Sequence, residues 1–339
     1  MSKKNLPSQK ESSKGATITP ALELNVDADL RRLCESCIGF GEYILPFSRR
    51  VRVELQRVRE GDQPNVPFIP FFAHGSIPLG EVRTLFTNIF PNYPLLRVIQ
   101  LYHCSLGDEG ILVIVNFVRT YRPSTAKNPF GIQCIEVPGC QIGPVGAKHI
   151  GTLFMESETL NCCVLDFNPL GDAGAKAIAT TLQWNGTLKD LSLQHCAIGA
   201  AGAEALAEGA LKCSNIRALS LRGNHLGPEG VKHVGTALGV STTIESIDIA
   251  DTRFGHSCDA VEALCQGIGK CTSLTSVDMD YNVLNPDAAS LVTAVLVENK
   301  RLTEFRVHER MDSDLYLMIQ HALERNGRAL RKSKKRTKS

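Results

Sequence analysis

The sequence predicts an elongated α/β solenoid in which one short strand and one helix recur and stack into a horseshoe. Three observations support this prediction. Related strings recur at steps of 28 residues, apolar residues alternate as in a strand at the start of each string, and an apolar helical pattern follows. We expect the strands to form a parallel sheet on the concave face and the helices to cover the convex face.

The repeating unit is clearest in LSLRGNHLGPEGVKHVGTAL, which runs from Leu219 to Leu238. Positions equivalent to its Asn224 follow one another at steps of 36, 28, 28, 28, 28 and 30 residues. These positions are Cys104, Cys140, Asn168, Cys196, Asn224, Thr252 and Asn282. The surrounding strings share the pattern L-x-L-x-x-[NCT]-x-L-G, and weaker units lie around 77–80 and at Phe305 and Val307. The repeats therefore account for most of the chain.

Each part of the unit has a physical reason. The L-x-L alternation predicts a short strand whose apolar side chains face inward. The Asn, Cys or Thr stands where the chain leaves the strand, so we expect a small side chain that bonds or fills beside buried backbone groups. A glycine such as Gly230 marks the start of the helix, which then reads apolar at i, i+3, i+4 and i+7. A single unit cannot bury its own apolar face, so the units must stack.

These repeats resemble the leucine-rich repeats of the ribonuclease-inhibitor-like class, which have 28 residues and a full helix in each unit. The resemblance covers roughly residues 70–327. It implies a solenoid that presents a long concave surface, and it is specific to the class rather than to one member.

The pattern divides the chain into four segments. Residues 1–20 are rich in Lys and Ser and are expected to be disordered. Residues 21–70 do not fit the repeat and are expected to cap the first repeat. The repeat array spans 71–327, with an insertion near 121–130 that is either a binding loop or a tolerated one. Residues 328–339 form a basic C-terminal tail.

Composition and charge narrow the class of protein. The 339 residues are 43% hydrophobic with a net charge of +2, so a nucleic-acid ligand for the whole molecule is not indicated. No apolar run is long enough to span a membrane, and the first residues lack the apolar stretch of a secretory signal. We therefore expect an intracellular, cytoplasmic protein whose twelve cysteines are free thiols, with a cytoskeletal, ciliary or nuclear location as alternatives.

No motif in the sequence predicts catalysis, a cofactor or a metal site. Cys34 and Cys37 form a lone C-x-x-C without a second pair, so a structural role is favoured over zinc. The stretch 267–272 imitates a phosphate-binding loop but lacks the residues that such a loop requires, and it falls in phase with the repeat. We expect a protein that is not an enzyme.

The repeat register also predicts the concave face, because residues between and just after the inward leucines point outward. Its last three strands concentrate Asp248, Asp251, Asp278, Asp280, Glu304 and Glu309 against Arg306 alone. Asp248 and Asp278 hold equivalent positions, so like charges are expected to lie side by side unless solvent, a cation or a partner screens them. A solvated acidic face and a docking surface for a basic protein segment both remain open. The predicted partner-binding residues are Tyr102, His103, Phe167, Asp190, His195, Arg222, Asp248, Asp251, Asp278, Asp280, Tyr281 and Glu304.

The basic tail is a second candidate site. Its cations are Arg331, Lys332, Lys334, Lys335 and Arg336, followed by Lys338. They fit a nuclear signal, a contact with acidic protein surfaces or RNA, or simply a solvated end. Nucleic acid is an unfavoured ligand except through this tail.

Three functions are compatible with these observations. The first is a non-catalytic scaffold that binds a protein partner, with no homo-oligomer expected. The second is a structural subunit of a cytoskeletal or ciliary assembly. The third is a GTPase regulator, because the array resembles that of Ran GTPase-activating proteins. Those proteins typically carry an acidic C-terminal stretch, whereas this chain ends in basic residues, so no catalytic arginine is assigned.

Overall fold

The strands form one open parallel sheet in the computed structural model, which describes residues 26–60, 71–93, 96–121, 131–212 and 215–336. Within these residues there are nine strands, and each pairs in parallel with the next one along the chain. They are β1 (Phe71–His74), β2 (Val98–Tyr102), β3 (Cys134–Glu136), β4 (Cys162–Val164), β5 (Asp190–Ser192), β6 (Ala218–Ser220), β7 (Ser246–Asp248), β8 (Ser276–Asp278) and β9 (Glu304–Arg306).

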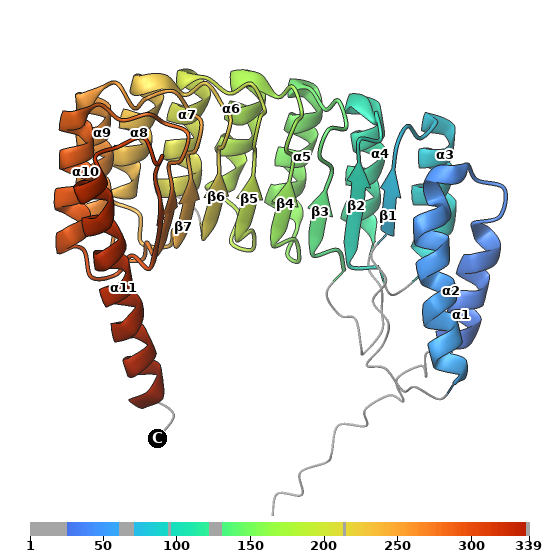
Figure 1. Ribbon diagram of the computed structural model, residues 1–339. Coiled ribbons are helices and arrows are strands. Elements are labelled where there is room, and N and C mark those ends of the chain that lie inside the picture. Colours follow the sequence, from blue (N-terminus) through green and yellow to red (C-terminus); the bar gives the residue numbers. More distant parts are fainter. Residues whose placement is uncertain (1–25, 61–70, 94–95, 122–130, 213–214, 337–339) are drawn as a thin grey trace, which may run out of the picture.

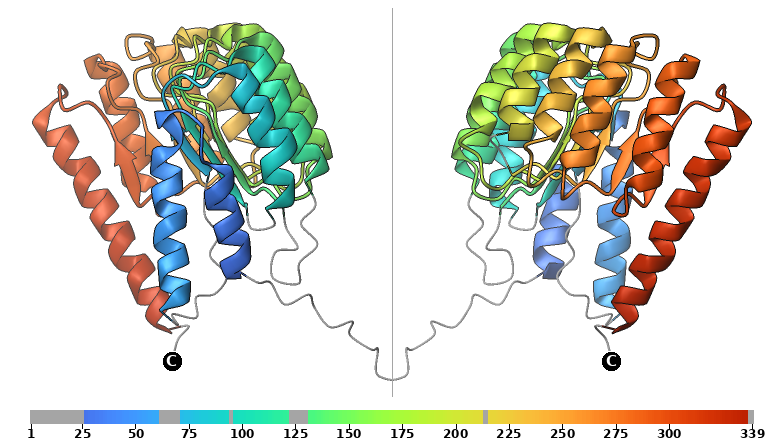
Figure 2. Two further views of the ribbon diagram at one scale, coloured as in Figure 1. Left: turned by 90° about the vertical axis from the view of Figure 1, so that its right-hand side faces the viewer. Right: turned by 90° about the vertical axis from the view of Figure 1, so that its left-hand side faces the viewer.

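Helices alternate with the strands and cover one face of the sheet, while the strands line the inner face of the arc (Figures 1 and 2). The repeat helices are α4 (Gly107–Thr120), α5 (Pro144–Glu156), α6 (Gly171–Leu182), α7 (Ala200–Leu206) continued by η4 (Ala207–Lys212), α8 (Gly227–Leu238), α9 (Cys258–Lys270) and α10 (Pro286–Glu298). The predicted solenoid with a parallel sheet and helices on its other face is therefore confirmed.

The core follows from the predicted alternation. Leu191 and Leu193 of one unit and Leu219 and Leu221 of the next are all buried, at 2% exposed or less. Leu191 is the register partner of Leu219, so equivalent leucines stack from unit to unit. Burying a leucine side chain contributes about 1.5–3 kcal/mol, which makes this ladder the main stabilising term of the solenoid.

Aspartates tie the beginning of one helix to the beginning of the next. Oδ1 of Asp172, in the first turn of α6, accepts hydrogen bonds from the backbone N–H groups of Gly199 (2.7 Å) and Gly202 (2.9 Å), at the start of α7. Asp108 of α4 does the same for Gly143 and Gly146 at the start of α5. A carboxylate at a helix N-terminus satisfies N–H groups that have no partner within the helix and favours the helix dipole.

The N-terminal end is closed by helices and aromatic rings. α1 (Val26–Ser36), η1 (Glu42–Ile44) and α2 (Leu45–Arg59) precede β1, and α3 (Leu79–Thr84), η2 (Leu85–Ile89) and η3 (Phe90–Asn92) follow it. The ring of Phe47 in α2 lies 5.1 Å from that of Phe71 in β1, which in turn lies 4.6 Å from Phe90. α2 therefore packs against the first strand, and Figure 1 shows α1 and α2 at that end of the sheet.

The C-terminal end carries the long helix α11 (Ser313–Arg336), which extends beyond the sheet (Figure 1). The middle of α11 packs against the C-terminal end of α10. Arg325 donates to the carbonyls of Val297 and Asn299, both at 2.9 Å. Asn326, which is buried, donates to the carbonyls of Asn299 and Leu302. The helix then continues through Arg336, so the basic residues of segment 328–339 begin on an ordered helix.

Two of the predicted segments lie outside the described residues. These are the N-terminal segment 1–20 and residues 122–130 of the expected insertion. Tyr121, where that insertion was expected to begin, is buried at the end of α4, and its hydroxyl donates to the carbonyl of Tyr93 at 2.6 Å. Tyr121 thus packs with the repeat helix that precedes the expected insertion.

Candidate functional site

Two columns of residues run side by side where the strands end. The buried column is Cys104, Cys140, Asn168, Cys196, Asn224, Thr252 and Asn282, all at most 2% exposed. The exposed column is the residue just before each of these, and it consists of His103, Gly139, Phe167, His195, Gly223, Asp251 and Tyr281.

The buried column joins each unit to the one before it. Oδ1 of Asn224 accepts from the backbone N–H groups of Cys196 (2.9 Å) and Ile198 (3.1 Å), and its amide donates to the carbonyls of Leu193 and Leu221. The thiol of Cys196 donates to the carbonyl of Leu165 at 3.2 Å. Because buried backbone groups are costly to leave unpaired, this column is structural.

The buried column alternates between two kinds of residue, a feature that the single-unit repeat pattern does not contain. From Cys140 to Asn282 an asparagine occurs in every second unit, with a cysteine or threonine between. The side-chain oxygen of each asparagine accepts hydrogen bonds from backbone N–H groups of the preceding unit. Asn168 accepts from the N–H of Cys140, and Asn282 accepts from that of Thr252. The true period is therefore two units, and the order of Cys and Asn in the sequence carried that signal.

The exposed column has a common backbone conformation. All seven residues have positive φ, between 50° at His195 and 69° at Gly223. Glycine adopts this conformation freely, whereas other residues pay about 1–2 kcal/mol. Two units use glycine, so the turn itself does not require the side chains of the other five. Those five were all among the predicted partner-binding residues.

The side chains of the exposed column interact along the face. His195 stacks on Phe167, with centroids 4.8 Å apart and planes inclined by 11°. The histidine also covers the next unit, because a Cβ on Gly223 would lie 2.1 Å from its Cε1 atom. His103 covers Gly139 in the same way. The rings of Phe167 and Tyr281 remain 54% and 61% exposed, so they are available for contact.

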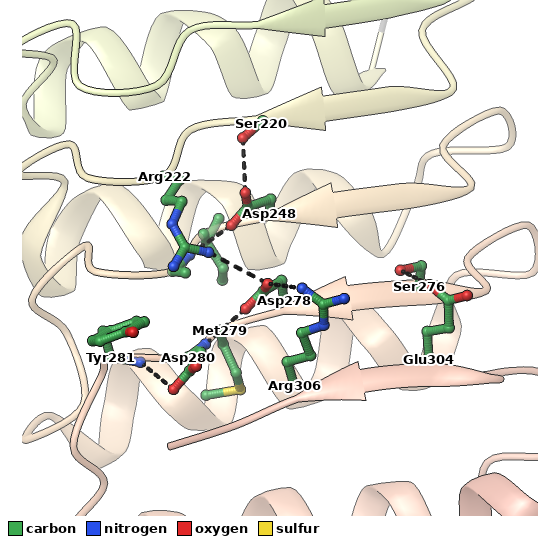
Figure 3. A network of polar contacts seen from close by, with 12 residues as sticks. Ser220, Arg222, Asp248, Ser276, Asp278, Met279, Asp280, Tyr281, Glu304 and Arg306 are labelled. Atoms are coloured by element: carbon green, nitrogen blue, oxygen red, sulfur yellow. Dashed lines mark hydrogen bonds and ion pairs between the residues drawn. The ribbon is translucent and has the colours of Figure 1, made fainter. Parts of the chain in front are cut away.

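Acidic residues lie on the last strands, where Asp248 and Asp278 are register partners as expected (Figure 3). They do not face each other unscreened, however. Asp278 lies 3.5 Å from Arg222 Nη1 and 3.5 Å from Arg306 Nη1, and its side chain is only 15% exposed. Asp248 accepts from the hydroxyl of Ser220 (2.9 Å) and from the N–H of Ala250 (3.0 Å). The chain supplies its own screening.

Arg222, one of the predicted partner-binding residues, is a second cation beside Arg306 in this region. It belongs to the turn after β6, and its side chain passes the unit of β7 to reach Asp278 of β8, as Figure 3 shows. Ala250, the equivalent residue of the intervening unit, is 0% exposed although the repeat register placed it outward. The guanidinium lies 5.3 Å from the ring centroid of Tyr281, a cation–π distance. Pairing over two units leaves no local pattern in the sequence.

Burial sets the ionisation of two carboxylates on this face. It raises the pKa of Asp248 above its ordinary value, and the negative charge of Asp278 adds to the rise, against hydrogen bonds from Ala250 and Ser220. Burial likewise raises the pKa of Asp166, which accepts from Ser192 and from the N–H of Gln194. Both carboxylates are engaged within the chain, so neither is the most available contact for a partner.

The remaining predicted residues differ in availability. Asp190, Asp251 and Glu304 are exposed. Asp280 is partly buried and accepts from the N–H of Tyr281 at 2.7 Å. The hydroxyl of Tyr102 donates to the carboxylate of Glu136, and burial together with that hydrogen bond raises the pKa of Tyr102. The open acidic contacts therefore lie around Asp251 and Asp280, whereas Glu304, at the start of β9, accepts from the hydroxyl of Ser276 at 3.2 Å.

The basic segment comes close to this surface at one point. Arg331 lines a groove between α11 and β9 together with Arg306, Arg328 and Glu304. Arg331 and Lys332 are exposed, and Lys334, Lys335 and Arg336 are the last basic residues of α11. Glu304 and Arg331, which the sequence assigned to separate sites, thus border the same groove.

No helix in the described part of the chain is long and apolar enough to cross a membrane. No group of three or more His, Cys, Asp or Glu side chains in this part of the chain is arranged to hold a metal ion.

Comparisons with known proteins give a family match and distant structural similarities. The family model described as "Leucine Rich repeat" matches residues 157–179, 185–207 and 212–234. These three matches coincide with the units of β4, β5 and β6, where the 28-residue steps are strict. A search of curated proteins found no match.

Three solved structures are similar at low scores. The tropomodulin C-terminal domain from Caenorhabditis elegans is 16% identical with a TM-score of 0.32, over 48% of this chain and 81% of that one. Actin-binding site 2 of leiomodin-1 is 13% identical with a TM-score of 0.32, over 66% and 93%. TLR13 in complex with ssRNA13 is 13% identical with a TM-score of 0.39, over 70% and 31%.

Proposed function

We propose that this chain, a leucine-rich repeat protein, is a non-catalytic scaffold that holds a protein partner against its concave face. The exposed column carries the proposal. Phe167, His195, Asp251 and Tyr281 occupy turn positions that glycine fills in two other units, so the fold does not need their side chains. Large aromatic side chains left exposed on a rigid surface are the groups that contribute most to protein interfaces.

The partner segment that fits best is basic and carries an apolar or aromatic residue. Asp251 and Asp280 offer carboxylates near Tyr281, whose ring is 61% exposed, while Glu304 lies at the other end of the strands, beside Ser276 (Figure 3). We place the centre of the contact around Tyr281 rather than at Asp248 and Asp278, because those two are already held by Ser220, Arg222 and Arg306. A lysine or arginine of the partner would meet charge that the chain leaves open, and this favours encounter and orientation.

The test is site-specific photocrosslinking in cells that express the protein. A photoreactive phenylalanine analogue replaces Tyr281 in one variant and Gln266, on the convex helix α9, in another. We expect the variant at position 281 to crosslink a partner, and we expect the variant at position 266 not to crosslink that same protein. Sequencing of the crosslinked peptide should identify a basic segment. Crosslinks to the same partner only from position 266 would contradict binding through the concave face.

A charge reversal distinguishes specific docking at the concave face from non-specific electrostatic binding. Asp251→Lys should reduce capture of the crosslinked partner by about tenfold, the effect of losing an interface contact worth about 1.4 kcal/mol. The matched control is Glu262→Lys, which reverses an exposed charge on α9 and should leave capture unchanged. An equal loss in both variants would point to a non-specific electrostatic effect.

The identity of the crosslinked protein separates the alternative functions. A small GTPase as the main crosslinked protein would favour the GTPase regulator, and a whole cytoskeletal assembly would favour the structural subunit.

A further inference from the structure

Two cysteines lie side by side on the concave face at the N-terminal side of the acidic region. Cys134 of β3 and Cys162 of β4 are register partners in neighbouring parallel strands. The residues that follow them, Ile135 and Cys163, are 2% and 0% exposed and face the core. Since side chains alternate along a strand, both Cys134 and Cys162 point outward, and both are partly exposed.

A second pair of neighbouring thiols provides the contrast. Cys104 and Cys140 also occupy equivalent positions of adjacent units, and their side chains contact each other. Both are 0% exposed, and their thiols donate to the backbone carbonyls of Ala73 and Leu101. In both pairs the two thiols are neighbours, but Cys134 and Cys162 are partly exposed to solvent whereas Cys104 and Cys140 are buried.

The surroundings of the outward pair make its two sulfurs unequal. A hydrogen bond from the thiol of Cys134 lowers the pKa of Cys162, although burial and the carboxylates of Asp190 and Glu136 act against it. The same hydrogen bond, with burial, raises the pKa of Cys134. The Sγ of Cys134 also lies 3.5 Å from a carboxylate oxygen of Glu136, which disfavours a thiolate there, so Cys162 is the better nucleophile and Cys134 the better second thiol.

We propose that Cys134 and Cys162 form a reversible disulfide across β3 and β4 when the protein meets a hydroperoxide. The thiolate of Cys162 attacks the peroxide, the O–O bond breaks, and the leaving oxygen takes a proton to become an alcohol, or water when the oxidant is hydrogen peroxide. The sulfur of Cys134 then attacks the resulting sulfenic acid, and water leaves as the S–S bond forms. Two thiols are oxidised and one hydroperoxide is reduced.

The sheet geometry permits this bond and keeps it reducible. Adjacent strands are about 4.8 Å apart, which falls within the range of about 4.4–6.8 Å that disulfides span between Cα atoms but below their usual separation. A bond formed at the short end of the range is strained, and strained, accessible disulfides are the readily reduced ones. The bond would also remove the thiol that lies 3.5 Å from Glu136, the residue that accepts from Tyr102.

The experiment treats the full-length reduced protein with graded hydrogen peroxide, blocks free thiols, and quantifies linked peptides by mass spectrometry. We expect the Cys134–Cys162 link at about tenfold lower peroxide than any link between Cys104 and Cys140, because access governs oxidation. A thiol reductant should reverse it. Equal peroxide dependence of the two pairs, or oxidation that stops at sulfenic acid in the wild-type chain, would overturn the proposal.

Two serine variants test the order of the steps. Cys134→Ser should leave a lasting sulfenic acid at Cys162 that dimedone traps, whereas Cys162→Ser should leave Cys134 reduced. Both variants should fold, because Ser246 and Ser276 occupy the same strand position in later units. Circular dichroism checks this. Sulfenic acid at Cys134 in the Cys162→Ser variant, at the wild-type rate, would contradict the assigned roles.

Discussion

Tyr281 and Asn282 are neighbours in the chain, but they belong to regions of opposite character. Asn282, in the buried column, is 2% exposed and bonds to backbone groups of the preceding unit and of its own. Tyr281, in the exposed column, is 61% exposed and has a backbone conformation that glycine adopts in two other units. The same adjacency holds for Phe167 with Asn168 and for Gly223 with Asn224.

The difference shows how this solenoid separates stability from recognition. In the buried column the choice of residue is restricted, because each side chain must pair buried backbone groups. In the exposed column the backbone is fixed but the side chain varies, so histidine, phenylalanine, aspartate and tyrosine occur, with glycine at Gly139 and Gly223, which the preceding histidines cover. Repetition along the chain therefore marks the residues that hold the fold, and departure from repetition marks the candidates for binding.

The largest expected effect is at the buried column. Asn224→Ala would leave the N–H groups of Cys196 and Ile198 and the carbonyl of Leu193 without their side-chain partner. Each unpaired buried group costs about 1–3 kcal/mol, so we expect a loss of at least about 3 kcal/mol in the free energy of unfolding. Urea denaturation followed by circular dichroism measures it.

Cys196→Ala is the comparison within the same column. It removes one thiol donor, at 3.2 Å from the carbonyl of Leu165, and should cost about 1 kcal/mol. A loss for Asn224→Ala no greater than that for Cys196→Ala would mean that the asparagines do not hold the units together.

A smaller effect is expected where the exposed column needs glycine. In Gly223→Ala, the new Cβ would lie 2.1 Å from Cε1 of His195 at a φ of +69°. We expect a loss of about 1–2 kcal/mol, together with displacement of His195 from its stack on Phe167. Thermal unfolding measures the loss, and the imidazole NMR shifts report the displacement.

Gly269→Ala provides the matched control, because a Cβ there meets no atom within 4 Å and the residue lies in helix α9. It should leave stability unchanged or raise it by up to about 1 kcal/mol. If both alanine variants lost the same stability, the contact with His195 would not be the cause.

The stability effect of Asp248 is smaller and depends on pH. Its folded-state pKa is raised by burial, so the folded chain holds this proton more tightly than the unfolded chain. The stabilisation from protonation is therefore complete below the ordinary value of 3.8 and is lost as the pH rises through the raised pKa. In Asp248→Asn, the amide oxygen still accepts from the N–H of Ala250 and the amide NH2 can donate to the hydroxyl of Ser220, so the advantage over the wild type should grow with pH.

Urea denaturation at several pH values between 3 and 7 tests this prediction, because a carboxyl with a raised pKa loses its proton within about this interval. Asp251→Asn, at an exposed position, is the control. An advantage of Asp248→Asn that shrinks as the pH rises would contradict burial as the cause.

The fold could be predicted from the sequence because it rests on local repetition. The strands at Leu191, Leu219 and Ile247 follow the L-x-L pattern, and even the weak unit around 77–80 has its strand, β1. The candidate site was predictable only in part. Phe167, Asp251 and Tyr281 were predicted as residues that follow the inward leucines; a period of two alone would turn them inward, and the positive φ of the turn is what exposes them. The pairing of Arg222 with Asp278 spans two units and depends on a small residue between them, so no single repeat reveals it.

The smallest expected effect on stability is at Tyr281, and it tests the central claim most directly. Tyr281→Gly gives the exposed column the residue that Gly139 and Gly223 already show to be compatible with the turn. We would measure the thermal unfolding of this variant and its capture of the crosslinked partner side by side. The account predicts unfolding at the wild-type temperature with capture largely lost. Unchanged capture, or a clear drop in unfolding temperature, would contradict the separation of fold and recognition between the two columns.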